Sequence, residues 1–203
     1  KGKEKNKKII CEQFGLKIDK PLIIFIGRLV GEKAADILAD AIVACMYSLQ
    51  GMVNFLVLGS GDPHVESQLQ QLTNSFQGNY NAMIGYNETL SHQMYAAADF
   101  ILMPSRVEPC GLNQMYAMQY GTVPIVRSTG GLKDTVIDMD DDGWGIRFNH
   151  ASVGDIIHSA GRAAELYYDK KEQLHTMRNK MMQINNSWEN SVQKYLDVYK
   201  GLK

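Results

Sequence analysis

Residues 99–131, DFILMPSRVEPCGLNQMYAMQYGTVPIVRSTGG, carry the pattern that decides the fold of this chain. An apolar run at 99–104 ends in a polar turn, a helical stretch covers 112–120, and a second apolar run covers 122–127. Nearly continuous hydrophobicity over a few residues is typical of strands that are covered on both faces of a parallel sheet. Two such strands joined by a helix predict a right-handed βαβ unit.

The same alternation extends outward over most of the chain. Apolar runs occur at 21–27, 53–59, 81–86, 99–104, 122–127 and, more weakly, 144–148, and helical spacing occurs at 34–49, 65–76, 90–98 and 112–120. Residues 152–203 predict two or three helices without a strand, with Trp188 packed as an anchor of the last one. We therefore predict one α/β domain over residues 1–203, with a doubly wound, Rossmann-like parallel sheet and extra carboxyl-terminal helices.

Composition narrows the class of protein. With 203 residues, 45% of them hydrophobic and 21% charged, the chain has enough apolar material for one sizeable core. A net charge of -1 gives no electrostatic reason to expect nucleic acid or an anionic membrane as a partner. No apolar run reaches the length of a membrane span, and no signal peptide is recognisable.

Cysteine and histidine patterns favour a metal-free cytoplasmic protein. The three cysteines form neither a disulfide framework nor a zinc motif, which favours a reducing cytoplasm. None of the five histidines falls in a metal-binding spacing. Since the chain begins at Lys1 without a methionine, we interpret it as a domain of a longer protein.

In an open α/β sheet the ligand crevice lies outside the carboxyl ends of the strands, so the loops that follow the apolar runs are the expected binding segments. In GRLVGEK, Arg28 ends the first strand and Lys33 lies near the next helix start. An Arg fork and a Lys point charge beside a helix amino terminus suit a diphosphate, although two solvated basic residues are the alternative. The segment is neither a Walker A loop nor a G-x-G-x-x-G fingerprint.

The EPCG segment, residues 108–111, is the strongest single indication of a site. Glu108 lies at the carboxyl end of a core strand, where it can accept hydrogen bonds from a polyol. The backbone N–H groups of Leu112 and Asn113 are expected at the first turn of the next helix, where they can hold a phosphate. Cys110 is either a nucleophile or a packed pocket-wall residue, and we favour the second interpretation.

Two further loops carry possible binding residues. Tyr86 lies at a strand end, where its ring can stack on a nucleobase or simply pack. In RSTGGLKD, Thr129 is a possible helix N-cap, and Gly130 permits close approach of the backbone. GSGDP, residues 59–63, is interpreted as an ordinary turn.

Taken together and in order, GRLVGEK, LGSGDP, IGYNETLSH, SRVEPCGLNQMYAMQYGTVPIVRSTGGLKDTV and SWENSVQKYLDVYKGL resemble the carboxyl-terminal domain of bacterial glycogen synthases and plant starch synthases. The resemblance covers nearly the whole chain, and residues 104–136 are its most specific part. It implies the GT-B fold, in which two Rossmann-like domains face each other across a cleft. It also implies retaining transfer of glucose from ADP-glucose or UDP-glucose to the non-reducing end of an α-1,4-glucan, without a metal ion or cofactor.

The resemblance also implies a role for each site residue. Arg28 and Lys33 match the basic pair that binds the donor phosphates, and Glu108 matches the carboxylate that contacts the glucosyl ring. Cys110 and Gly111 match the pocket floor beneath the sugar. Leu112 and Asn113 match the backbone donors to the distal phosphate, and Tyr86 matches the residue beside the base. Thr129 and Gly130 are also expected to bind substrate, because of their place in the RSTGG loop.

The chain departs from the family pattern in a few places. Tyr116 stands where the wider class carries a second Glu, Val107 where an aromatic is usual, and Ala34 where Gly usually follows the Lys. The amino-terminal domain of the family is not part of this chain. It supplies a Lys-x-Gly-Gly-Leu loop and most of the acceptor surface, and residues 187–203 are expected to run back to it with an apolar face partly exposed.

Three other functions fit the sequence less well. A non-catalytic nucleotide-sugar or glucan-binding module is disfavoured because Arg28, Lys33 and Glu108 are all retained. A dinucleotide oxidoreductase domain is disfavoured by the missing glycine fingerprint. A pyridoxal-phosphate-dependent glucan phosphorylase shares the two-domain architecture, but no stretch resembles its cofactor lysine.

Overall fold

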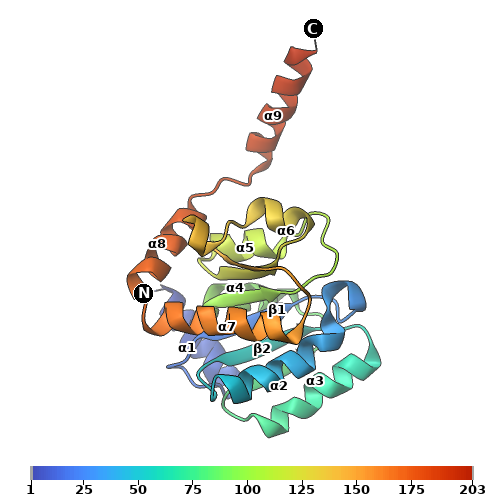
Figure 1. Cartoon of the computed structure of the whole chain (residues 1–203), viewed down its shortest axis with the longest axis vertical. Helices are drawn as coiled ribbons and strands as arrows, with labels where there is room; N and C mark the ends of the chain where they lie inside the picture. The colour runs from blue at the N-terminus through green and yellow to red at the C-terminus, as the bar shows by residue number, and fades with distance from the viewer. Residues whose placement is uncertain (1, 203) are drawn as a thin grey trace.

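The computed structural model describes residues 2–202, and a wholly parallel sheet of six strands lies at its centre (Figure 1). The strand order is β3-β2-β1-β4-β5-β6, so the direction of winding reverses between β1 and β4. This order confirms the predicted doubly wound sheet. The strands are β1 (Leu22–Ile26), β2 (Asn54–Gly59), β3 (Tyr80–Ile84), β4 (Phe100–Met103), β5 (Val123–Arg127) and β6 (Ile146–Phe148).

Helices connect the strands and follow the last of them. They are α1 (Gly2–Phe14), α2 (Leu38–Ser48), α3 (Pro63–Ser75), α4 (Glu88–Ala97), α5 (Asn113–Gln119), α6 (Gly130–Thr135), α7 (Val153–Tyr168), α8 (Lys171–Met182) and α9 (Trp188–Gly201). Short 3-10 turns occur at η1 (Gly31–Lys33), η2 (Ala35–Ile37) and η3 (Met139–Asp141). Within residues 2–202, no helix combines the length and the apolar character that crossing a bilayer requires.

The helix predicted to begin at residue 34 begins later. Ala34 has φ 55° and ψ 33°, the left-handed conformation, and it separates the 3-10 turns η1 and η2. A left-handed residue interrupts a right-handed helix, so regular α2 starts only at Leu38. Glycine adopts this conformation without strain, which gives a structural reason for the glycine that the family pattern has here.

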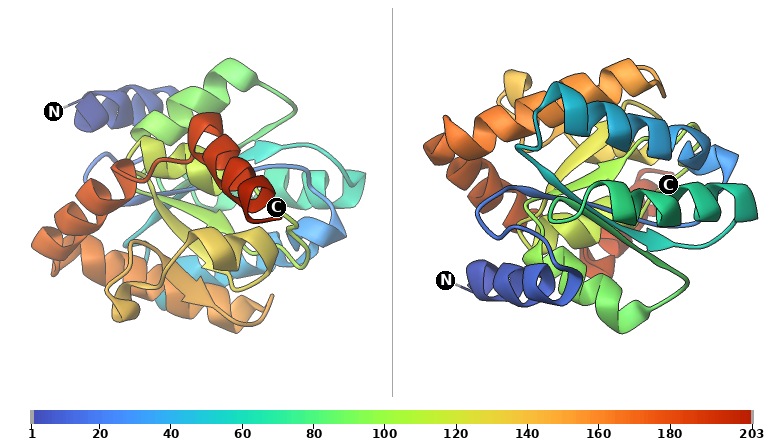
Figure 2. Two further views of the ribbon diagram at one scale, coloured as in Figure 1. Left: turned by 90° about the horizontal axis from the view of Figure 1, so that it is seen from above. Right: turned by 90° about the horizontal axis from the view of Figure 1, so that it is seen from below.

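Alternating strand residues divide the core into two layers of side chains. Ile23 and Phe25 of β1 pack with the apolar residues of α2, α3, α7 and α8, while Leu22 and Ile24 pack with α1, α4, α5 and α6. Figure 2 shows α1 and α4 on one side of the sheet and α2 and α7 on the other. Each strand is therefore covered on both faces, as its nearly continuous hydrophobicity predicts.

Polar residues in two of the loops start the helices that follow them. Asp62 accepts a hydrogen bond from the backbone N–H of His64 at 2.8 Å and caps α3. Asn87 accepts from the N–H of Leu90 at 2.9 Å and caps α4. These side chains satisfy N–H groups that have no partner inside the helix. The predicted ordinary turn at residues 59–63 is wrong, because Gly61 still pairs in parallel with the segment that follows β1 and Asp62 leads directly into α3.

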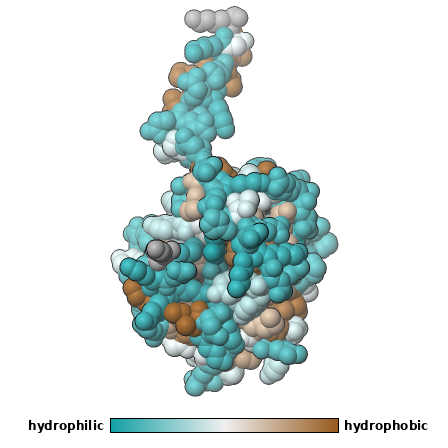
Figure 3. All heavy atoms as spheres, turned by 90° about the vertical axis from the view of Figure 1, so that its left-hand side faces the viewer, coloured by the Kyte–Doolittle hydropathy of each residue, from teal (hydrophilic) through white to brown (hydrophobic). Residues whose placement is uncertain are grey.

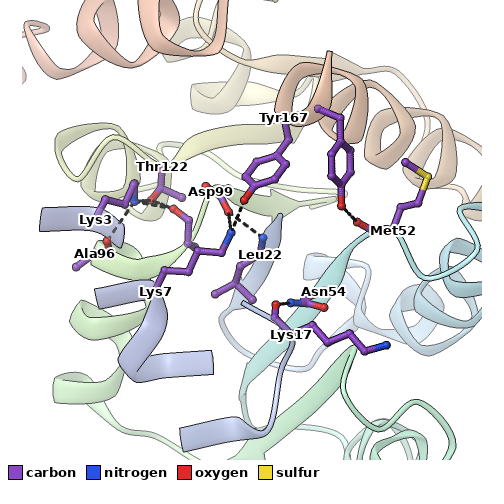
Figure 4. A network of polar contacts seen from close by, with 12 residues as sticks. Lys3, Lys7, Lys17, Leu22, Met52, Asn54, Ala96, Asp99, Thr122 and Tyr167 are labelled. Atoms are coloured by element: carbon purple, nitrogen blue, oxygen red, sulfur yellow. Dashed lines mark hydrogen bonds and ion pairs between the residues drawn. The ribbon is translucent and has the colours of Figure 1, made fainter. Parts of the chain in front are cut away.

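A buried carboxylate joins several elements at the amino ends of the strands (Figure 4). Asp99 accepts from Lys7 Nζ of α1 at 2.7 Å, from Arg178 Nη2 of α8 at 2.8 Å, and from the backbone N–H of Leu22 at 3.0 Å. Burial alone raises the pKa of the Asp99 carboxyl, but the charges of Lys7 and Arg178 and the hydrogen bonds bring it below its ordinary value. Lys7 also donates to the hydroxyl of Tyr167 in α7, at 3.0 Å.

Helix α9 stands apart from the body of the domain (Figures 1 and 3). None of its residues is buried. The predicted packing of Trp188 is wrong, because this side chain is 80% exposed at the start of the helix. The expected exposure of the apolar face is confirmed, and its large side chains are Val192, Tyr195, Leu196 and Tyr199.

Candidate functional site

The loops after β1 and β4 leave the sheet on either side of the point where the strand order reverses. The β1 loop comprises residues 27–37 and the β4 loop residues 104–112. A pocket of about 440 Å³ opens outside the carboxyl ends of β1, β2 and β3. Three predicted site residues line it, together with an aromatic group contributed by α4 and α5: Arg28, Tyr86 and Asn113, and His92, Tyr95 and Tyr116.

Arg28 and Tyr86 lie at the exposed rim of this pocket. The Arg28 side chain is 67% exposed, and its guanidinium lies 3.1 Å from the carboxylate of Glu32. Tyr86 is exposed, with its hydroxyl 3.5 Å from a carboxylate oxygen of Glu88. Both side chains are free to turn towards a ligand, since an exposed ion pair contributes only about 0–1 kcal/mol and the exposed Tyr86 contact is a long hydrogen bond.

Lys33 and Glu108 form an ion pair between the two loops. Lys33 Nζ lies 2.5 Å from Glu108 Oε2, and the hydroxyl of Ser105 donates to the same oxygen at 3.0 Å. Glu108 is buried, while the Lys33 side chain is 24% exposed. The structure thus brings together a cation and a carboxylate that lie far apart in the sequence and that do not line the pocket itself.

The EPCG segment packs directly against the start of α6. The backbone N–H of Gly131 donates to the carbonyl of Glu108 at 3.0 Å. A Cβ atom at Gly130 would lie 2.2 Å from that carbonyl, and one at Gly131 would lie 2.0 Å from the carbonyl of Cys110. The predicted close approach of the backbone is therefore confirmed, and it is made to the EPCG segment of the protein itself.

Thr129 occupies the N-cap position of α6, but its side chain makes no capping hydrogen bond, so that part of the prediction is wrong. The physical reason is the neighbouring loop. The Glu108 carbonyl already accepts from Gly131, whose N–H a capping hydroxyl would otherwise satisfy.

The remaining predicted residues lie around the turn into α5. Cys110 is exposed, so it is not a packed side chain, and its thiol lies 3.6 Å from the carbonyl of Gly111. Gly111 has φ +74°, a conformation that favours glycine. Leu112 is exposed just before α5. The side-chain amide of Asn113 donates through Nδ2 to the carbonyl of Ile26 at 2.8 Å. This last bond ties the start of α5 to the end of β1.

Gln114 is a site residue that the sequence did not reveal. Its side chain is fully buried, and Nε2 donates to the carbonyls of Cys110 and Gly111, at 3.2 and 3.0 Å, and to the hydroxyl of Thr135 at 3.1 Å. Gln114 therefore fixes the peptide groups of the EPCG turn. A glutamine in the first turn of a helix is usually solvated, so only the fold shows this role.

The β1 and β4 loops are also joined by Arg106. Its guanidinium donates to both carboxylate oxygens of Asp36 and to the carbonyl of Gly31, and the contact to Gly31 measures 2.7 Å. The backbone N–H groups of Arg106 and Val107 both donate to the carbonyl of Glu32, at 2.8 and 3.2 Å. Neither Arg106 nor Asp36 was singled out from the sequence.

The strand order and this crevice define a Rossmann-like domain, and in such folds ligands bind outside the carboxyl ends of the strands at the switch point. The chain belongs to the family Glycosyl transferases group 1, which matches residues 6–179.

Comparison with individual proteins places the chain next to glycogen and starch synthases. It is 56% identical over 198 residues to a glycogen synthase of Flavobacterium johnsoniae, covering 98% of this chain and 42% of the relative. It is 37% identical to starch synthase 2 of Arabidopsis thaliana, covering 100% of this chain and 26% of the relative. The chain thus spans about two fifths or less of the length of these relatives. Its predicted membership of the glycogen and starch synthase family is confirmed.

A solved structure supports the same assignment. The catalytic domain of starch synthase IV from Arabidopsis thaliana, bound to ADP and acarbose, superposes with a TM-score of 0.87 at 35% identity. The match covers 98% of this chain and 42% of that one. The fold is therefore that of the carboxyl-terminal domain of a GT-B glycosyltransferase.

Proposed function

We propose that this chain is the donor-binding half of a retaining glucosyltransferase of the glycogen and starch synthase type. The complete enzyme transfers glucose from ADP-glucose or UDP-glucose to the non-reducing end of an α-1,4-glucan. The observation that carries this proposal is the Lys33–Glu108 ion pair at the switch point, with Arg28 at the rim of the adjacent pocket. Identity of 56% to a glycogen synthase supports it.

The nucleoside of the donor occupies the pocket at the ends of β1 to β3. Aromatic rings of Tyr86, Tyr95 and Tyr116 line this pocket, and flat apolar surfaces of that kind suit a base. The diphosphate then reaches Arg28 and Lys33, whose positive charges stabilise the negative charge that develops on the leaving group. An ammonium group has three donors, so Lys33 can contact a phosphate while it stays paired with Glu108.

Glu108 lies beside the glucosyl ring in this arrangement. Its carboxylate stabilises the positive charge that develops at the anomeric carbon, because a fixed charge in a water-poor site acts strongly on the transition state. Ser105 and Lys33 hold the carboxylate in one orientation through Oε2. Cys110 and Gly111 form the floor beneath the sugar, and the backbone N–H groups of Leu112 and Asn113 donate to the distal phosphate.

The acceptor glucan and an amino-terminal domain are the proposed partners. The length that the relatives have beyond this chain provides room for such a domain. The exposed apolar face of α9, which includes Val192 and Tyr199, supports the proposal because it has no cover within the described residues. A cytoplasmic location is proposed as well, and the free thiols of all three cysteines support it.

Loss of either basic residue is expected to weaken nucleotide binding. Charged hydrogen bonds contribute roughly 1.5–3 kcal/mol each, so Arg28→Ala and Lys33→Ala each raise the Kd for ADP or UDP about tenfold or more. Calorimetric titration of the purified chain measures this change, with Lys171→Ala on the exposed end of α8 as the matched control. An unchanged affinity in the double variant contradicts the assignment, provided that its melting temperature shows a folded protein.

The chain alone is expected to bind nucleotide weakly and to transfer no glucose. Its crevice is open to water, which screens the charges, and a Kd on the order of 0.1–1 mM follows. Transfer fails because nothing orients the acceptor against the donor, and orientation supplies a large part of such a barrier. The measurement is glucan elongation with ADP-glucose and UDP-glucose at high protein concentration. Clear elongation shows that the acceptor site lies within this chain.

A further inference from the structure

The Lys33–Glu108 pair depends on contacts between two loops. Lys33 belongs to the β1 loop and Glu108 to the β4 loop, so no single element fixes their separation. The contacts that join these loops lie immediately beside the pair. Arg106 reaches Gly31 and Asp36, which lie on either side of Lys33 in the chain, and Arg106 itself is two residues before Glu108.

Arg106 is also held by a contact from β5. Arg127, the last residue of β5, donates through Nε to the carbonyl of Ser105 at 2.7 Å and through Nη2 to the carbonyl of Arg106 at 2.5 Å. The start of the β4 loop therefore lies between the end of β5 and the β1 loop, with hydrogen bonds on both sides. A segment fixed in this way can transmit its position to the loop that it touches.

The β1 loop needs such a contact. Ala34 follows Lys33 and holds a left-handed conformation, which is unfavourable for an L-residue with a Cβ. Strained residues persist where the surrounding structure holds them, and they are found mainly at functional sites. Asp36 lies two residues after Ala34, and its bidentate bond to Arg106 closes the strained turn.

Global stability does not explain the Arg106–Asp36 pair. The two side chains are 39% and 50% exposed, and ion pairs of that exposure contribute little to stability. The pair nevertheless has the planar, two-bond geometry that gives directional control. Its geometry is thus suited to orientation, and the groups that it orients are the turn with Lys33 and the loop with Glu108.

We propose that Arg106 and Asp36 are positioning residues for sugar transfer. Neither touches the donor. Together they hold the β1 and β4 loops in register, so that the cation on the diphosphate and the carboxylate beside the sugar act on the same bond. This inference rests on the proposed function, because Lys33 and Glu108 matter only if the donor binds between these loops.

The test is steady-state kinetics of the complete enzyme that contains this chain. Asp36→Asn and Arg106→Lys each remove the bidentate ion pair and keep the size of the side chain. A displacement of about an ångström at a reacting group costs up to about a hundredfold in rate, so kcat falls about tenfold to a hundredfold while KM for the donor changes less. The matched control is Glu165→Gln, which breaks the Lys170–Glu165 pair of similar exposure, 43% and 47%, and leaves kcat unchanged.

The same substitution in an enzyme that lacks the Glu108 carboxylate distinguishes positioning from a general loss of structure. In an enzyme that already carries Glu108→Gln, the change Asp36→Asn lowers kcat by less than threefold, because one of the two charges that must be aligned with each other is already lost. Melting temperatures of Asp36→Asn and Glu165→Gln shift by similar small amounts. Equal losses of kcat from Asp36→Asn in both backgrounds, or no loss in either, overturn the inference.

The same experiment distinguishes the two levels of the proposal. If Glu108→Gln lowers kcat and Asp36→Asn does not, the positioning role is wrong and the proposed function stands. If Glu108→Gln itself leaves kcat unchanged, the proposed role of Glu108 and the positioning role are both wrong. If the unsubstituted complete enzyme transfers no glucose to a glucan, the proposed function is wrong.

Discussion

Glu108→Gln is expected to lower kcat of the complete enzyme by about 10²–10³-fold and to change the Kd for free ADP by less than threefold. Removing one group that stabilises developing charge typically has an effect of that size on kcat. In the proposed arrangement the nucleotide contacts Arg28 and Lys33 and not Glu108, so ground-state affinity is expected to be preserved. Interactions made only in the transition state change kcat in this way.

The structure makes Glu108→Gln a suitable substitution. A glutamine has nearly the same shape, and its carbonyl oxygen still accepts from Lys33 and from the hydroxyl of Ser105, which pair with Glu108 in the wild type. The turn therefore keeps its hydrogen bonds while the negative charge is lost. Initial rates of glucan elongation and calorimetry with ADP are the measurements, and Glu165→Gln in α7 is the control. A variant with wild-type kcat contradicts the role of Glu108.

Asp99→Asn is expected to lower the free energy of unfolding by about 3–5 kcal/mol at pH 7. Breaking a buried ion pair by removing one partner leaves an uncompensated charge, and costs of that size are typical. Here the change leaves Lys7 and Arg178 without their carboxylate. Urea unfolding at pH 7 measures the loss, and Asp19→Asn at an exposed loop position is the control.

The pH dependence of stability provides an independent check of Asp99. Its folded-state pKa lies below the ordinary value, so the stability that its ionised form contributes is complete above the unfolded pKa of about 3.9. That contribution is lost as the pH falls below this value and through the folded pKa. As the pH falls below about 4, the wild type therefore loses more stability than Asp99→Asn. Parallel losses in the two proteins contradict the shift.

The sequence predicted the sheet well because each strand is covered on both faces. Runs such as LIIFI in β1 and FILM in β4 contain no polar residue, and short runs of this kind between helical segments are typical of buried parallel strands. Helix α1 was not predicted, because its sequence is rich in lysine and its buried residues are few. One of these is Lys7, and a buried lysine is expected only where a partner such as the Asp99 carboxylate compensates its charge.

The loops that form the candidate site were predicted, and the contacts between these loops were not. The loops that carry Arg28, Lys33 and Glu108 follow from the rule that ligands bind outside the carboxyl ends of strands. That Lys33 meets Glu108, and that Arg106 meets Asp36, depends on how loops from β1 and β4 approach each other. Such pairs are separated by about 70 positions or more, and no local spacing encodes them.

The ionic contacts of Asp99 also affect the local unfolding of the helices that they join. Terminal helices are usually the first parts of a domain to fray, since few neighbours hold them. Here α1 and α8, which lie at the two ends of the compact part of the domain, both donate to the Asp99 carboxylate, through Lys7 and Arg178. Their amide protons are therefore expected to exchange together with those of the sheet. Helix α9 makes no such contact within residues 2–202, and its amides are expected to exchange independently.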